Sequence, residues 1–143
     1  MWEADGLQYG ATVHAGEGQV TIWDLETNEI AGTVPTAGPG LFVRSHDHSP
    51  YAWADALFAQ PQMTITVFEK EAPFEIVGVI DDGVMTLHPE FTADGKFAYV
   101  SDWNGAMVRV YDAVTLELVA EIEGVITPTG IFSVERRLET LGH

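Results

Sequence analysis

Short runs of alternating apolar and polar residues recur along this chain, and each run is followed by a turn signal. The clearest run is a β-branched strand that ends in an aromatic and an acidic residue, and it occurs at Val20–Thr27, Ile65–Lys70 and Val108–Thr115. A second strand follows each copy, at Glu29–Val34, Phe74–Ile80 and Glu117–Ile122. The aromatic positions, Trp23, Phe68 and Tyr111, are 45 and 43 residues apart. A period of this length, with several strands per unit, is typical of β-propeller blades.

The pattern predicts an all-β fold, a β-propeller arc of about three four-stranded antiparallel blades in an incomplete ring. The blades fall near residues 8–40, 41–83 and 84–125, with a C-terminal inner strand and tail at 126–143. Closed propellers usually have four or more blades. We therefore expect the chain to start in mid-blade at Tyr9 and to present unpaired strand edges at both ends of the arc. Such edges would pair with missing N-terminal blades or with a second copy of the chain.

Composition narrows the range of partners. The 143 residues suffice for one domain, and 46% of them are apolar, which suits a packed core. A net charge of −16 argues against binding to nucleic acid or to an anionic membrane surface. The absence of cysteine excludes disulfides, thiolate metal sites and a c-type haem attachment motif. No apolar run approaches the ~20 residues of a membrane span, and the first residues do not resemble a signal peptide.

Two histidines are candidates for chemistry, because inner strands line the channel of a propeller. His46 follows the inner strand predicted at 41–45, and His88 lies on the inner strand of the next blade. Imidazole near neutral pH can donate a proton, bind a metal or hydrogen-bond an anion. Alignment of the two blades places Phe42, not His46, opposite His88, and leaves His46 roughly 13 Å further along the strand. An irregular loop before Pro50 would remove that difference, and the alternative is that both histidines only cap turns.

Other residues could complete a ligand site. Arg44 lies two positions before His46 and suits a ligand carboxylate, unless it forms a structural salt bridge. Trp53 and Trp103 could wall a flat macrocycle, although most aromatics here should form the inter-blade core. A zinc site is a weaker alternative, because it would rest on few ligands, and we predict no resident metal ion. Its candidate ligands are His46 and His48 with Asp55 or His88.

Three segments of the chain carry a resemblance to a known family. They are Leu41–His46 before Tyr51–Asp55, Leu87–Gly95 before Val100–Gly105, and Thr127–Val134. Together they resemble the haem d1 propeller of cytochrome cd1 nitrite reductases and of related haem d1 biosynthesis proteins, including the dihydro-haem d1 dehydrogenases. The resemblance runs from about Gly16 to the end of the chain.

The resemblance implies an eight-bladed ring that holds haem d1 across one end of its channel. By motif, His46 and His88 match the two distal histidines that serve the reduction of nitrite to nitric oxide, and Arg44 would bind a haem carboxylate. The family's proximal iron ligand and its cytochrome c domain have no counterpart in this chain. A periplasmic location is also implied.

Three functions follow as hypotheses. The first is the C-terminal portion of a haem d1-binding propeller, which would supply the distal side of the site for nitrite reduction in denitrification. The second is a haem d1 maturation protein, similar to dihydro-haem d1 dehydrogenases, that binds a tetrapyrrole precursor. The third is a non-catalytic propeller module that binds protein. Full-length relatives are oxidoreductases, whereas we expect this chain alone to be inactive, so its status as an enzyme stays open.

Overall fold

The computed structural model describes residues 1–60 and 63–130, which form three four-stranded antiparallel sheets. The first comprises β1 (Trp2–Ala4), β2 (Leu7–Val13), β3 (Gln19–Asp24) and β4 (Ile30–Pro35). The second comprises β5 (Val43–Ser45), β6 (Tyr51–Asp55), β7 (Ile65–Glu69) and β8 (Ile76–Ile80). The third comprises β9 (Thr86–Phe91), β10 (Phe97–Asp102), β11 (Met107–Asp112) and β12 (Leu118–Glu123). The strands of each sheet are neighbours in chain order, so each sheet is a simple meander.

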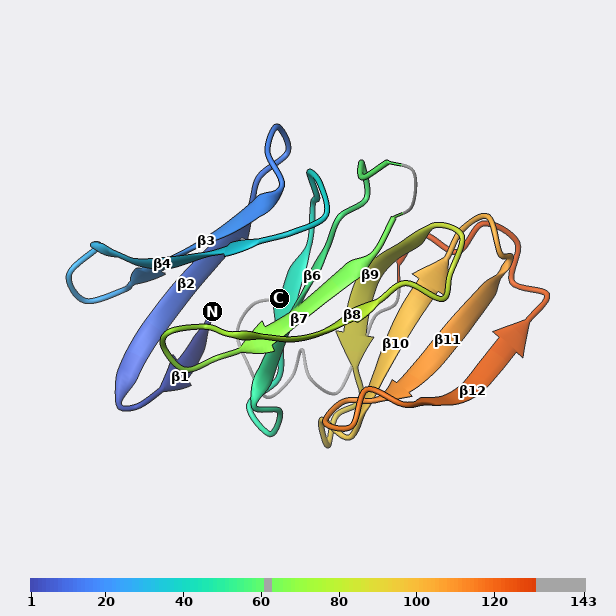
Figure 1. The fold of residues 1–143 in the computed structure, drawn as a ribbon. Coiled ribbons are helices and arrows are strands. Elements are labelled where there is room, and N and C mark those ends of the chain that lie inside the picture. The colour runs from blue at the N-terminus through green and yellow to red at the C-terminus, as the bar shows by residue number, and fades with distance from the viewer. Residues whose placement is uncertain (61–62, 131–143) are drawn as a thin grey trace.

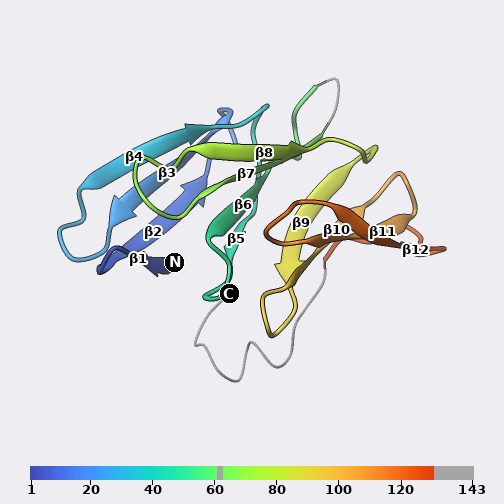
Figure 2. The same cartoon turned by 60° about the horizontal axis from the view of Figure 1, so that its bottom comes forward.

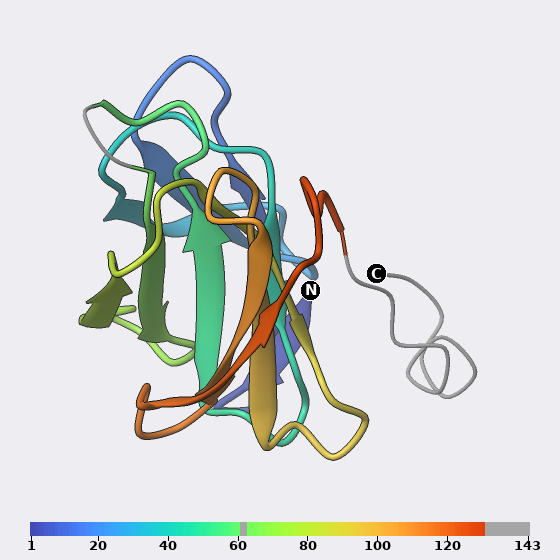
Figure 3. The ribbon, with the colours of Figure 1, turned by 90° about the vertical axis from the view of Figure 1, so that its right-hand side faces the viewer.

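The three sheets are the predicted blades, and they stand side by side with the second between the other two (Figure 1). Figure 2 shows β1, β5 and β9 toward the middle of the arc and β4, β8 and β12 on its outside. Figure 3 looks onto the third-blade end, where the gold-to-red strands come to the front. The prediction of an all-β arc of four-stranded antiparallel blades is therefore confirmed. No helix within the described ranges is long and apolar enough to span a membrane.

The blades are held together by apolar faces, because alternate residues of each strand point to opposite sides of its sheet. Phe68 joins a buried cluster with Trp2 and Ile22 of the first blade. Its neighbour Val67 joins a second cluster with Phe91 and Tyr111 of the third blade. The second blade is thus buried on both faces. Burial of a large apolar side chain contributes about 1.5–3 kcal/mol, so these two interfaces supply most of the driving force for stacking.

The recurring aromatic residue has the same place in every blade. Its strand shifts register against the outermost strand next to Trp23, Phe68 and Tyr111. Phe68 approaches Trp2 of the preceding blade at 6.3 Å between ring centroids, and Tyr111 approaches Trp53 at 6.2 Å. The aromatic repeat is therefore an inter-blade packing position that faces the preceding blade.

The turn after this aromatic residue also follows the sequence pattern. Asp24 Oδ1 accepts hydrogen bonds from the Glu26 and Thr27 N–H groups at 2.7 and 2.9 Å. Asp112 Oδ1 accepts from the Val114 and Thr115 N–H groups at 2.9 and 2.8 Å. An aspartate that accepts from the backbone two and three residues ahead is a common way to open a turn. These hydrogen bonds lower the pKa of both carboxyl groups.

Three expectations need correction or fall outside the described residues. The first blade does not start in mid-blade at Tyr9, because Trp2–Ala4 forms its inner strand and pairs with Leu7–Tyr9. The described ends of the arc present sheet faces rather than strand edges, since blades stack face to face. The inner strand expected from Pro128 onward is not a strand as far as Gly130, and its remainder lies outside the described residues.

Candidate functional site

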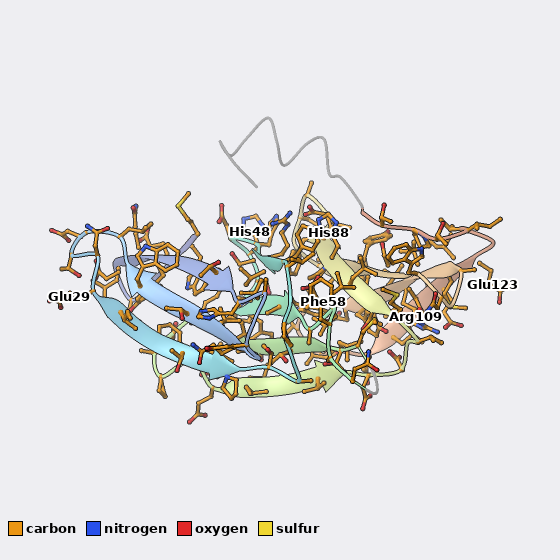
Figure 4. All side chains as sticks on the ribbon, turned by 90° about the horizontal axis from the view of Figure 1, so that it is seen from above. Glu29, His48, Phe58, His88, Arg109 and Glu123 are labelled. Atoms are coloured by element: carbon orange, nitrogen blue, oxygen red, sulfur yellow. The ribbon has the colours of Figure 1, made fainter. Side chains whose placement is uncertain are left out.

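Arg44, His46 and His88 come from β5, the loop after it and β9, and β5 and β9, the inner strands of the second and third blades, lie against each other. Figure 4, seen from above, shows His48 and His88 both on the inner side of the arc, whereas Glu29 and Glu123 lie at its two far ends. His88 comes from the middle of β9, and Arg44 comes from β5. The site is therefore an inter-blade site, which requires both sheets to be folded and docked.

The backbone of His88 departs from ordinary strand geometry. On β9, Leu87 pairs with Ser101 and Glu90 pairs with Tyr99, so two residues of β9 oppose one residue of β10. This is a β-bulge, a feature that redirects a side chain. His88 has a φ of 51°, in the left-handed region that a residue with a Cβ atom seldom adopts. Its N–H donates to Asp55 Oδ2 at 3.2 Å, which supports the strained backbone from the neighbouring blade.

The imidazole of His88 is buried and contacts Phe42, Arg44 and Thr129. It stacks on Phe42, with ring centroids 4.3 Å apart and an interplanar angle of 20°. Arg44 Nη2 lies 3.2 Å from Nε2, and the Thr129 carbonyl oxygen lies 3.4 Å from Nδ1. A guanidinium group can only donate and a carbonyl can only accept. These two contacts favour a neutral His88 with its proton on Nδ1 and its acceptor atom, Nε2, facing Arg44.

Electrostatics agree with this protonation state. Burial lowers the pKa of His88 below its ordinary value, and the positive charge of Arg44 lowers it further. The hydrogen bond to Thr129 and the negative charges of Glu90 and Asp55 act in the opposite direction. The His88 ring is thus kept as a neutral acceptor while Arg44 stays beside it. An anionic ligand that drew Arg44 away would make protonation of His88 easier.

Arg44 is a half-buried cation at the same inner edge. Its Nε lies 4.0 Å from Glu90 Oε2, and the two side chains are only 16% and 12% exposed. The guanidinium carbon also lies 5.7 Å from the centre of the Phe42 ring. Arg44 therefore takes part in the salt bridge that was the alternative interpretation of this residue. Such a guanidinium is also suited to exchange one carboxylate partner for another, because its five donors form a planar fork.

His46 lies nearer the C-terminal end of β9, where the second and third blades meet, and makes a different set of contacts. Its Nε2 donates to the Ala93 carbonyl oxygen at 3.1 Å, and its Nδ1 accepts from the His48 N–H at 3.1 Å. The ring centroid lies 6.1 Å from that of Phe91, three residues beyond His88 on β9. Three residues correspond to about 10 Å along a strand. The structure therefore pairs His88 with Phe42, as the blade alignment indicated, adds Arg44 to the pair, and leaves His46 one level away.

A buried lysine fixes the loop that carries His46. Lys70 Nζ donates to the carbonyl oxygens of His46 at 3.0 Å and Ser49 at 2.8 Å. The Lys70 carbonyl in turn accepts from Trp2 Nε1 at 2.8 Å, which ties the loop to the first blade. The sequence analysis did not identify this role. The only signal was a lysine directly after a buried strand in a chain with few basic residues.

The two candidate tryptophans, Trp53 and Trp103, do not lie where they could wall a macrocycle beside His88. Trp53 is fully buried in the inter-blade core, with ring centroids 6.0 Å from Phe91 and 6.2 Å from Tyr111. It therefore has no exposed face to offer a macrocycle, and the core interpretation of this residue applies. Trp103 is half-buried and follows β10, where its N–H bonds the Met85 carbonyl at the start of β9. That position is the opposite end of β9 from His46.

Asp55 is a central residue that the sequence analysis weighed only as a zinc ligand. Its carboxylate is fully buried and accepts backbone N–H groups from the segment before β5 and from β9, rather than facing a cluster of ligands. No group of three or more potential metal-binding side chains occurs among the described residues. A separate cleft of about 280 Å³ lies beside His48 and Lys70. It is smaller than the ~300–1,000 Å³ usual for sites of drug-sized ligands.

Comparison with known proteins adds the decisive observation. Residues 1–137 match the family described as the Cytochrome D1 heme domain. The chain belongs to this family. Within the d1 haem family, the dihydro-heme d1 dehydrogenase of Pseudomonas aeruginosa is 35% identical over 141 residues, which is 96% of this chain and 28% of that protein. The nitrite reductase of Stutzerimonas stutzeri is 31% identical over 121 residues, or 71% of this chain and 21% of the reductase.

A further d1 haem relative, the protein NirF of Stutzerimonas stutzeri, is 29% identical over 126 residues, covering 87% of this chain and 31% of NirF. A solved structure of the dihydro-heme d1 dehydrogenase NirN in complex with DHE superposes with a TM-score of 0.88 at 32% identity. It matches 96% of this chain and 30% of the NirN chain. The β-propeller domain of Cps50 (Swd1), at 20% identity and a TM-score of 0.63, shares the fold alone. The chain thus spans less than a third of the length of these d1 haem relatives.

Arg44 and His88 have chemistry that suits one side of a d1 haem-type ligand. Arg44 has the donor geometry that a tetrapyrrole carboxylate requires, and His88 stands beside it on the inner edge of the arc. The strained backbone of His88 is also typical of functional sites. Trp53 adds nothing to such a site, because it is enclosed by other side chains.

Proposed function

We propose that this chain forms one wall of a tetrapyrrole site in a d1 haem-type propeller that acts on a haem d1 precursor, as a dihydro-haem d1 dehydrogenase does. The observation that carries the proposal is the Arg44–His88 pair on adjacent inner strands, with Nη2 and Nε2 3.2 Å apart. The fold class, the family and the likeness to NirN support it. Nitrite reduction is the weaker candidate, because the nitrite reductase match is shorter and less identical than the dehydrogenase match.

In this proposal Arg44 binds a carboxylate on the edge of the tetrapyrrole and releases its contact with Glu90. Paired, charge-assisted hydrogen bonds make Arg44 the residue that orients the ring. His88 then holds or accepts a proton at Nε2, directed by its stack on Phe42. The proposed wall also includes His46, a second histidine at the inner edge of the arc, one level from His88. The missing wall comes from further blades, in the same polypeptide or in a second copy of the chain.

Tetrapyrrole binding to this chain tests the proposal. Titration with dihydro-haem d1 is expected to give a saturable new absorption band, and Arg44→Gln is expected to weaken the Kd by roughly 10–100-fold. That range corresponds to the ~1.5–3 kcal/mol of a hydrogen bond to a charged group. Lys96→Gln is the matched control, because Lys96 is an exposed cation that forms an ion pair with Asp94 of its own turn.

Three results would redirect the proposal. Equal affinity of the Arg44→Gln and Lys96→Gln variants would remove Arg44 from the site. Absence of a saturable band, together with a stable oligomer in size-exclusion chromatography, would favour the non-catalytic interaction module. Nitrite turnover by the loaded wild-type chain, lost in His88→Ala, would favour nitrite reduction instead.

A further inference from the structure

Through its side chain, Asp55 contacts the backbone of both inner-strand regions of this site. Its Oδ1 accepts hydrogen bonds from the N–H groups of Leu41 at 2.8 Å and Phe42 at 3.0 Å. Its Oδ2 accepts from the N–H of His88 at 3.2 Å. The side chain is fully buried, at 0% exposure. One carboxylate therefore fixes the backbone of both rings that stack on each other, Phe42 and His88.

The third blade contains a matched residue that makes no such bridge. Asp102 ends β10 as Asp55 ends β6, and it also accepts N–H groups from the segment that leads into its inner strand. Its Oδ1 accepts from Met85 at 2.9 Å and Gly105 at 3.0 Å. Its Oδ2 accepts from the guanidinium of Arg109. All of these partners belong to the third blade. Both aspartates therefore accept N–H groups from the segment before the inner strand of their own blade, but only the Asp55 bonds described here also reach the next blade.

The bond from Asp55 lies at the point of greatest backbone strain in the site. His88 is the residue of β9 with a positive φ, at the bulge that aims its ring toward Arg44. A left-handed residue with a Cβ atom costs on the order of 1–3 kcal/mol and persists only where its surroundings hold it. A hydrogen bond to a buried carboxylate is about twice as strong as a neutral one. Asp55 has the position and the charge to supply that support.

We propose that Asp55 is a positioning residue, whose carboxylate holds the His88 backbone in its left-handed bulge and so directs Nε2 of His88 toward Arg44. The inference rests on the proposed tetrapyrrole site for its functional meaning, and on geometry alone for its structural part. Burial raises the pKa of Asp55 even though three N–H groups oppose that shift, which indicates that the carboxylate is kept in this place at an electrostatic cost.

Asp55→Asn separates the two halves of this arrangement. The amide oxygen can still accept from Leu41 and Phe42, but the amide nitrogen would then face the His88 N–H, donor against donor. The matched control is Asp102→Asn. It disturbs the equivalent hydrogen bonds within the third blade and leaves Asp55 in place as the acceptor of the His88 N–H. The first readout is the tautomer of His88 by ¹⁵N NMR of the full chain. The second is the Kd for dihydro-haem d1.

The expected result is specific to Asp55. In the wild type and in Asp102→Asn, His88 should hold one tautomer, with the proton on Nδ1. In Asp55→Asn, we expect a mixture of tautomers and a Kd weakened by about 10-fold, which corresponds to ~1.4 kcal/mol. A single Nδ1–H tautomer in Asp55→Asn, or the same mixture in both variants, would overturn the proposal. If neither the wild type nor either variant binds dihydro-haem d1, the proposed function fails. The tautomer comparison then still decides the role of Asp55.

A wild-type experiment covers the case in which Asp55→Asn does not fold. The groups around His88 are Arg44 on β5, Asp55 on β6, Glu90 on β9 and the Thr129 carbonyl. Acidification of the wild-type chain should shift the His88 amide proton in the same step as the Asp55 carboxyl signal. An amide shift that follows Glu90 and not Asp55 would overturn the proposal as well.

Discussion

At the scale of single residues, His88 combines a buried ring with a backbone that strands normally avoid. Its φ of 51° follows from a bulge, and its neutral ring follows from Arg44 on one side and a carbonyl oxygen on the other. The sequence identified His88 by its place on an inner strand. It could not reveal the protonation state, because that depends on residues 44 and 41 positions away in the chain.

The neutral state of His88 predicts a pH dependence of stability. Its folded-state pKa is lowered by burial and by Arg44, so below the unfolded pKa of about 6.5 the unfolded chain binds a proton that the folded chain resists. The free energy of unfolding should therefore fall between pH 7.5 and 5.5, and His88→Gln should reduce that fall. Urea denaturation at the two pH values measures the difference.

Arg44→Gln provides the internal control for this experiment. It keeps the imidazole but removes the neighbouring charge, so its pH dependence should lie between those of the wild type and His88→Gln. If His88→Gln has the same pH dependence as the wild type, the assignment of a lowered His88 pKa is wrong.

At the scale of elements, the turn between β9 and β10 both closes a hairpin and seats His46. The structure has a tight turn at Asp94-Gly95, a residue pair that suits such turns, with the Gly95 N–H bonded to the Thr92 carbonyl at 2.9 Å. What the sequence did not indicate is that the glycine leaves room for a ring from another blade. A Cβ atom at Gly95 would lie 2.4 Å from His46 Nδ1.

Gly95→Ala should therefore be more harmful than an ordinary glycine substitution in a turn. Gly95 has a φ of +71°, so the backbone alone makes alanine unfavourable by about 1–2 kcal/mol, and displacement of His46 adds to that loss. Gly6→Ala is the matched control, because Gly6 has a φ of +75° and nothing within 4 Å of an added Cβ. Chemical denaturation of both variants gives the comparison. Equal losses would show that His46 moves away without cost.

At the scale of the whole molecule, stability comes from stacked blades rather than from a central core. The aromatic repeat serves this stacking, since Phe68 and Tyr111 each contact the preceding blade. Trp23 occupies the equivalent position in the first blade, over Gly10, on the face turned away from Ile22 and the second blade. No described blade of this chain covers that face.

The difference in partners predicts a difference in energy. Phe68→Ala should lower the free energy of unfolding by about 3–5 kcal/mol, the usual loss for a buried phenylalanine, whereas Trp23→Ala should cost clearly less in this chain. Urea denaturation monitored by circular dichroism measures both, and Phe68→Leu gives a milder variant if the alanine variant does not fold. Equal losses would mean that the Trp23 face is packed against something, such as a second copy.

The sequence by itself determined the blades. The alternation of apolar residues, the aromatic repeat and the turn residues are local signals, so they predicted the number of sheets, their antiparallel order and the family resemblance. Local signals also placed Arg44 and His88 on inner strands and His46 directly after one. The short first strand, Trp2–Ala4, was not predicted, because three residues are too few to show a periodic pattern.

Only the tertiary structure decided which residues meet. The blade alignment places Phe42 opposite His88, but the contact of His88 with Arg44 depends on the register between blades, which side-chain packing across the interface sets. Trp53 is enclosed for the same reason, and Asp55 gains its role by bonding across two blades. Such contacts join residues far apart in the chain, so no local pattern encodes them. The proposed periplasmic location stays a prediction from the resemblance.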